Sequence, residues 1–281
     1  MSLTIGGETK IDSEPCVVAW NNKLFVGTDT GSIFSFDSNL SPGASWTAHA
    51  VQLFALSANY GKVYSTSNDG GIRIWTSEGD KVSELPAPNA DIESICLHEK
   101  YVYAGDEQGN IYVYENNSLI AQYNVLEEVK DIAISPPLMF TVRDLYVTVT
   151  EIKPEQSKDR FTTLHVMEGR APLRVSGKHL VVTSRGGNNI QLHDIDLDSK
   201  FKKLHEVKVS DMIITSMSAR DGVVWTGGWD GCAKRWKIDE EKLQPAGEIN
   251  LGACINALVA VTGDTAYALL TGGKIICIKA A

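Results

Sequence analysis

The chain has 281 residues, of which 43% are apolar and 24 are glycines, and its formal net charge is −9. This length and composition suffice for a full hydrophobic core, and the many glycines with few helix-period patterns indicate short strands joined by tight turns. The acidic balance argues against general nucleic-acid binding, and no apolar run approaches the roughly 18 residues that a membrane span requires.

The amino-terminal residues MSLTIGGETKIDSEP lack the basic and apolar regions of a secretory signal peptide. The cysteines are five in number and widely spaced, and each lies in an apolar strand pattern: Cys16, Cys96, Cys232, Cys254 and Cys277. An odd number of scattered cysteines favours a reducing compartment over a disulfide framework. We therefore expect a cytoplasmic or nuclear protein.

Short alternating strands recur seven times along the chain, each after a turn with glycine, asparagine or aspartate. In chain order they are residues 31–36, 70–75, 109–114, 144–148, 188–193, 232–236 and 273–278. The mean spacing between them is about 40 residues, which is the period of four-stranded propeller blades. The sequence predicts an all-β fold, a seven-bladed β-propeller of four-stranded antiparallel blades, as a single domain over residues 1–281.

The second repeat shows the expected order of strands within a blade. Strands are predicted at 51–57, 62–67, 72–76 and 81–86, with turn residues between them. The fourth strand is the most polar, so we expect it to lie outermost. Helix-period patterns are nearly absent.

The two ends of the chain complement each other. The last repeat stops one strand short, and the amino terminus offers a spare strand at residues 2–6. We expect this strand to complete the last blade and close the ring, because closure removes unpaired sheet edges.

Two repeats resemble those of the WD-repeat β-propeller family. In that family a histidine before the innermost strand, a serine or threonine on the second, an aspartate in the next hairpin and a tryptophan on the third form a hydrogen-bonded tetrad. The matching residues are His49, Ser65, Asp69 and Trp75 in the second repeat, and Thr226, Asp230 and Trp236 in the sixth, where the histidine position falls near Val209. The other repeats are degenerate. The resemblance implies that these side chains are structural and that the propeller binds other proteins.

Catalytic motifs are absent from the sequence. The six histidines stand in separate stretches without metal-ligand spacing, and there is no nucleophile elbow or phosphate-binding loop. We predict a protein that is not an enzyme and has no cofactor or metal. The alternative is a quinoprotein-like or hydrolytic propeller enzyme with a site on the central axis, since residues 24–46 and 102–117 also resemble quinoprotein-type repeats. An anionic-lipid-binding propeller is a weaker third interpretation, because its paired arginines are missing.

Trp229 is the main candidate for partner binding, because it lies in the hairpin between the second and third strands of the sixth repeat and interface hot spots are enriched in tryptophan. The alternative is that its ring covers a neighbouring loop and stabilises the turn. Other hairpin residues expected on the same face are Arg185, Asn68, Asp29, Asp106 and Glu107. The entry loops 87–91, 125–129 and 208–212 are expected to border this face. A charged insertion at 151–160 is expected to form a loop on the opposite face.

This face is mostly acidic, so a protein or peptide partner of basic or mixed charge fits it best. The sequence therefore predicts a non-catalytic interaction scaffold that is a subunit or adaptor of a multiprotein complex.

Overall fold

The computed structural model describes residues 2–87, 91–156 and 160–281, and every regular element within them is a β-strand. No helix in these ranges could span a membrane. The chain forms two compact units, one of residues Cys16–Glu168 and one of Met1–Pro15 with Gly169–Ala281. The assignment of the whole chain to one domain stays a prediction.

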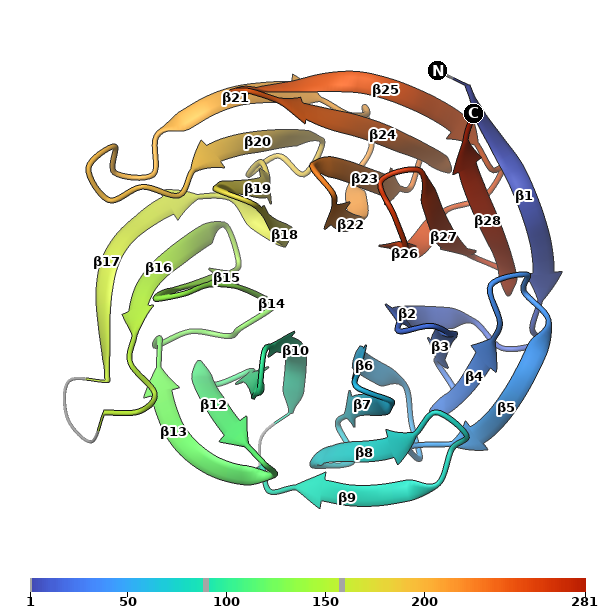
Figure 1. The fold of residues 1–281 in the computed structure, drawn as a ribbon, viewed down its shortest axis with the longest axis horizontal. Helices are drawn as coiled ribbons and strands as arrows, with labels where there is room; N and C mark the ends of the chain where they lie inside the picture. Colours follow the sequence, from blue (N-terminus) through green and yellow to red (C-terminus); the bar gives the residue numbers. More distant parts are fainter. Residues whose placement is uncertain (1, 88–90, 157–159) are drawn as a thin grey trace. The chain divides into compact units, whose positions relative to one another are not determined.

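The unit Cys16–Glu168 contains four antiparallel sheets of four strands, each in sequence order (Figure 1). The strands are β2 (Pro15–Trp20), β3 (Leu24–Thr28), β4 (Ser32–Phe36) and β5 (Pro42–Thr47); β6 (Leu53–Asn59), β7 (Lys62–Ser67), β8 (Ile72–Thr76) and β9 (Lys81–Leu85); β10 (Ile92–His98), β11 (Tyr101–Asp106), β12 (Asn110–Glu115) and β13 (Ser118–Asn124); and β14 (Asp131–Ser135), β15 (Leu138–Arg143), β16 (Tyr146–Ile152) and β17 (Phe161–Glu168).

The other unit contains three four-stranded antiparallel sheets. The strands are β18 (Arg170–Ser176), β19 (His179–Thr183), β20 (Asn189–Asp194) and β21 (Lys203–Lys208); β22 (Ile214–Arg220), β23 (Val223–Gly228), β24 (Cys232–Asp239) and β25 (Lys242–Asn250); and β26 (Ile255–Ala260), β27 (Thr265–Leu270), β28 (Lys274–Ala280) and β1 (Leu3–Lys10).

These seven four-stranded blades confirm the predicted fold class, a β-propeller. In the second blade, β7 and β8 coincide with the predicted strands. The fourth blade departs from the prediction, because residues 144 and 145 form a turn and β16 begins at Tyr146. Within this strand Val147 is fully buried.

Burial along each blade follows the apolar pattern of its strands. The second strands β3, β11, β19 and β23 are buried at every residue, whereas the fourth strands β5, β9 and β17 are largely exposed. In these blades the fourth strand forms the sheet edge and is largely exposed, because it has only one neighbouring strand.

Glycines near the ends of second strands let the next blade approach closely. A Cβ on Gly105 would lie 2.4 Å from Val129 Cγ1, and one on Gly227 would lie 2.7 Å from Ile255 Cγ2. Both contacts are far shorter than normal carbon–carbon packing distances. A larger residue at either position would require Val129 or Ile255 of the next blade to shift.

A buried arginine joins the sixth and seventh blades. Arg235 on β24 is 2% exposed, its Nε donates to Gly263 O at 2.7 Å, and its Nη2 lies 2.6 Å from Asp264 Oδ1. The guanidinium carbon also lies 6.0 Å from the ring centre of Trp225. Gly263 and Asp264 belong to the turn between β26 and β27 of the seventh blade. The charge of Arg235, on the sixth blade, is therefore paired across the interface between these two blades.

The amino-terminal strand completes the seventh blade, as the sequence predicts. β1 pairs antiparallel with β28 from Leu3 opposite Ala280 to Lys10 opposite Lys274, with an irregularity between Ile5 and Gly7. Leu3 joins the hydrophobic cluster of this blade.

The segment after β1 is also bound to the seventh blade. Glu14 Oε1 accepts from Asn256 Nδ2 at 2.7 Å, and its Oε2 accepts from the Gly272 N–H at 2.9 Å. Asn256 Oδ1 in turn accepts from the Thr271 hydroxyl at 3.0 Å. The amino-terminal segment is therefore held by side chains as well as by strand pairing.

Deleting residues 1–8 removes most of β1, so we expect the melting temperature to fall by about 5 °C or more. The physical reason is that β28 loses its ladder partner and the cluster around Leu3 becomes exposed. Thermal unfolding followed by circular dichroism measures this. An unchanged melting temperature would show that β1 does not support the seventh blade.

Candidate functional site

The hairpin with Trp229 is built around a tight turn between β23 and β24. The Gly231 N–H donates to Gly228 O at 3.1 Å, Gly231 has φ +71°, and Asp230 Oδ1 accepts from the Cys232 N–H at 3.0 Å. Glycine at the fourth turn position and an aspartate that bonds two residues ahead are typical of such turns. This geometry places Trp229 at the tip.

Trp229 is 61% exposed, so most of its surface is open to solvent. The backbone N–H of Trp229 donates to Ile213 O at 3.1 Å, which fixes the hairpin against the loop that precedes β22. In that loop Met212 is 52% exposed. Two large apolar side chains therefore stand in solvent on adjacent, hydrogen-bonded loops.

A third segment lies beside the same loop. The hairpin between β19 and β20 contains Arg185, which is exposed. Asn188 O in this hairpin accepts from the Val209 N–H at 2.9 Å, and Gly187 O accepts from the Ile214 N–H at 2.8 Å. Arg185, Met212 and Trp229 therefore lie on three segments of one unit, and each segment is hydrogen-bonded to the next.

Charged groups of both signs surround these residues. Lys208 and Asp211 form an ion pair, and Lys234 Nζ lies 3.7 Å from Asp230 Oδ2 and 3.6 Å from Glu248 Oε1. This surface is therefore mixed in charge.

The remaining predicted surface residues belong to the other unit. Asp29, Asn68 and Glu107 are exposed in their hairpins. In the entry loop 87–91, residues 88–90 lie outside the described residues. In the insertion 151–160, residues 157–159 also lie outside them. In the described part of that insertion, Glu155 accepts a hydrogen bond from the Tyr101 hydroxyl at 2.6 Å.

Asp106 differs from the expectation, because its side chain is fully buried. Its Oδ1 accepts from the Gln108 and Asn110 N–H groups, and its Oδ2 accepts from Asn110 Nδ2 and the Tyr112 hydroxyl at 2.8 and 2.9 Å. The carboxylate therefore stabilises its own hairpin and is not available on the surface. The sequence pattern placed it at a hairpin tip, one residue too far from the strand.

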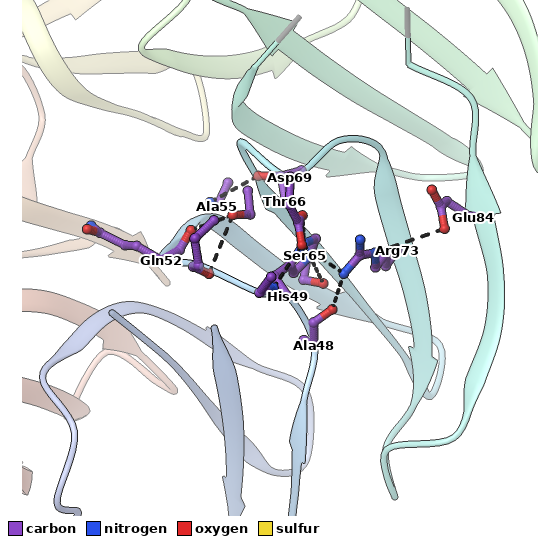
Figure 2. A network of polar contacts seen from close by, with 12 residues as sticks. Ala48, His49, Gln52, Ala55, Ser65, Thr66, Asp69, Arg73 and Glu84 are labelled. Carbon is purple, nitrogen blue, oxygen red and sulfur yellow. Dashed lines mark hydrogen bonds and ion pairs between the residues drawn. The ribbon is translucent and has the colours of Figure 1, made fainter. Parts of the chain in front are cut away.

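The second blade contains a continuous polar network (Figure 2). His49 Nδ1 lies 2.6 Å from Asp69 Oδ1, His49 Nε2 lies 2.9 Å from Ser65 Oγ, and Trp75 Nε1 donates to Ser65 Oγ at 2.9 Å. The Ala50 N–H donates to Asp69 Oδ2 at 2.8 Å. The four residues that the family resemblance singled out are thus directly hydrogen-bonded.

The hydrogen-bond partners in this network, together with the directions of the pKa shifts, indicate its proton positions. Burial lowers the pKa of His49, although Asp69 opposes the shift. Burial of Asp69 acts to raise its pKa, but the Ala50 N–H and His49 outweigh this and the pKa is lowered. Because Asp69 is ionised it can only accept, so His49 Nδ1 carries the proton and the Ser65 hydroxyl donates to Nε2.

The sixth blade contains part of the same network. Trp236 Nε1 donates to Thr226 Oγ1 at 3.0 Å, and Thr226 is fully buried. Lys234 Nζ donates to the carbonyl of Val209, and Asp230 is its nearby carboxylate.

In the second blade Arg73 takes the place that Lys234 has in the sixth blade. Neither residue was identified from the sequence. Arg73 Nη1 donates to Ala48 O at 2.5 Å and lies 3.2 Å from Asp69 Oδ2 (Figure 2). Arg73 and Lys234 each stand two residues before the tryptophan of their blade, and this shared spacing is the sequence signal for them.

Several cavities lie along the described residues, and one of them lies between the third and fourth blades. A cavity of about 480 Å³ lies beside Tyr101, Tyr103, Pro137 and Glu155. None of the described residues that line it is a serine, threonine or cysteine, and residues 157–159 lie outside the described residues. No group of three or more histidine, cysteine or acidic side chains suited to a metal occurs in residues 2–87, 91–156 and 160–281.

No protein-family model matches the chain, and no curated protein matches its sequence. Solved structures do match it in fold. U3-55K is 15% identical, with a TM-score of 0.83, 99% of this chain covered and 98% of that chain. The computationally designed protein Ika8 is also 15% identical, with a TM-score of 0.73 and coverages of 97% and 98%. At this identity the likeness concerns the fold alone.

The lowered pKa of His49 gives a pH dependence of stability. In the unfolded chain His49 takes up a proton near the usual histidine pKa of 6.5, whereas in the folded chain burial opposes this protonation. The free energy of unfolding therefore falls as the pH drops below about 6.5. We expect His49→Gln to reduce this fall, with a remainder from His179, whose pKa burial also lowers.

Melting temperatures between about pH 7.5 and pH 5.5 measure the effect. His98→Gln, at a half-buried histidine in another blade, is the matched control. If His49→Gln and the wild type lose equal stability on acidification, the proposed protonation state of the network is wrong.

Proposed function

We propose that this protein is a non-catalytic scaffold of the WD-repeat type that binds a protein partner, as a subunit or adaptor of a multiprotein complex. The observation that carries the proposal is Trp229, which is 61% exposed on a hairpin whose backbone is fixed. A rigid exposed aromatic contributes contact area at little cost in conformational entropy, which suits an interface hot spot.

The surface around Trp229 supports a partner of basic or mixed charge. Met212 extends the apolar contact, and Arg185, Asp211 and Glu248 border it. An apolar centre with a charged rim is the usual composition of protein interfaces. Asp29, Asn68 and Glu107 are proposed as further contacts on the unit Cys16–Glu168, and Asp106 is left out because it is buried.

The hydrogen-bonded network of the second blade supports the WD-repeat assignment and a structural role for its residues. His49 and Ser65 are buried, and every polar atom of the tetrad described above has a partner. A histidine held in this way stabilises a crowded turn, where each orphaned group would cost about 1–3 kcal/mol. The fold that the chain shares with U3-55K is consistent with a scaffold in a complex. We place the protein in the cytoplasm or nucleus.

We expect Trp229→Ala to reduce recovery of the partner about tenfold or more in affinity purification with mass spectrometry, without changing the melting temperature. The double variant Trp229→Ala with Arg185→Glu should abolish recovery. Tyr60→Ala removes a 79% exposed aromatic from the turn between β6 and β7 and is the matched control. Undiminished recovery with the double variant would contradict the proposal.

A further inference from the structure

The entry loop before β22 is hydrogen-bonded to its neighbours at both of its ends. At the first end, the Val209 N–H donates to Asn188 O at 2.9 Å. At the second end, Ile213 O accepts from the backbone N–H of Trp229 at 3.1 Å. Met212, which is 52% exposed, lies between these two ends. The position of its side chain therefore depends on how firmly both ends are held.

Two glycines let the adjacent hairpins approach the second end of this loop. A Cβ on Gly187, in the hairpin between β19 and β20, would lie 2.8 Å from Ile213 Cδ1. A Cβ on Gly228, in the hairpin that carries Trp229, would overlap Ile213 O. Both approaches are closer than a side chain allows. The loop therefore lies tightly between two hairpins.

Lys234 on β24 joins the first end of the loop to the hairpin that carries Trp229. Its ammonium donates a hydrogen bond to the carbonyl oxygen of Val209. The same nitrogen lies 3.7 Å from Asp230 Oδ2 and 3.6 Å from Glu248 Oε1. Asp230 directly follows Trp229 in the chain. One side chain thus connects the entry loop with the hairpin tip.

The Lys234 side chain is largely covered by the protein itself. It is 15% exposed, whereas Met212 and Trp229 are 52% and 61% exposed. Val209, whose carbonyl it binds, is buried. Removing one member of a covered ion pair leaves the other charge without compensation. Loss of the ammonium would therefore release the loop from Lys234 and leave Asp230 without its cation.

We infer that Lys234 is a positioning residue for partner binding, an inference that rests on the proposed function. Lys234 does not contact the partner. It holds the entry loop and the hairpin in one arrangement, so that Met212 and Trp229 form a single preformed contact. A preformed surface binds more tightly than a mobile one, because less conformational entropy is lost when the partner docks.

The second blade indicates which substitution should preserve this arrangement. There Arg73 Nη1 donates to Ala48 O and lies 3.2 Å from Asp69 Oδ2. A guanidinium thus joins the same two groups, an entry-loop carbonyl and a hairpin carboxylate. Lys234→Arg keeps both the charge and the donors, whereas Lys234→Met has a similar length and neither.

Hydrogen exchange of the full chain, followed by nuclear magnetic resonance, tests the positioning directly. We expect Lys234→Met to speed exchange of the Val209, Met212 and Trp229 amides at least about tenfold, because local opening becomes easier. Lys234→Arg should keep the wild-type rates. Lys237→Met, the same substitution at an exposed position of β24, is the matched control.

Equal exchange in Lys234→Met and Lys237→Met would overturn the inference. The buried strand β27 supplies reference amides for the stability of the whole unit. Faster exchange in β27 as well would show that Lys234 supports the fold in general, and this result would also contradict a positioning role.

Affinity purification with mass spectrometry tests the effect on binding, and the protein followed is the one that Trp229→Ala loses. Lys234→Met should lower its recovery about fivefold, which corresponds to the ordering of one or two side chains. In a Met212→Ala background the same substitution should cost less, because Met212 is one of the side chains that Lys234 positions. An equal cost in both backgrounds would assign Lys234 a contact of its own and refute the inference.

Two further outcomes separate this inference from the proposed function. Recovery that falls with Trp229→Ala but not with Lys234→Met would overturn the role of Lys234 and leave the proposed function intact. If Trp229→Ala loses no protein, the proposed function is wrong, and the role of Lys234 in partner binding is wrong with it.

Discussion

The pairing of β1 with β28 joins the two ends of the chain in one sheet. Without it, β28 would be the edge of a three-stranded sheet, and the buried residues of the seventh blade would lose the cover that Leu3 supplies. Glu14 adds a second attachment through Asn256 and Gly272. Because the contacts of β1 with β28 bridge almost the whole sequence, they can form only when the last blade is present, and they carry a large loop-closure cost. The completed fold depends on that late contact.

Polar interactions inside the blades take different forms at equivalent places. The second blade uses His49 and Asp69 with Arg73, whereas the sixth uses Asp230 with Lys234. Each arrangement meets the same requirement, which is to satisfy backbone and side-chain groups where a hairpin meets the entry to the innermost strand. This explains how degenerate repeats preserve one architecture.

Much of this architecture could be predicted from the sequence, because strand alternation and turn residues are local signals. The strands β7 and β8 follow directly from them, and so does the exposed position of Trp229. The side-chain partners were harder to predict. Arg235 is charged and stands in an alternating strand, yet it is 2% exposed because Gly263 and Asp264 come from the next blade.

The misplacement of Asp106 has the same origin. Burial at a hairpin is decided by contacts such as that with the Tyr112 hydroxyl, and no local pattern encodes them. The exposed side chains also differ in how far the sequence predicts their exposure. A tryptophan in a glycine-rich turn is visible in the sequence, whereas the exposure of Phe161, Leu164 and Val166 depends on what the neighbouring blades leave uncovered.

The meeting of β1 and β28 also brings the chain ends together. The Ala281 N–H donates to Ser2 O at 3.1 Å, so the two termini are adjacent within one sheet. A short linker could join them without disturbing the ladder, and the polypeptide could then start at an exposed turn elsewhere. A circularly permuted chain would keep every blade while drawing all four strands of the seventh from one continuous stretch of sequence.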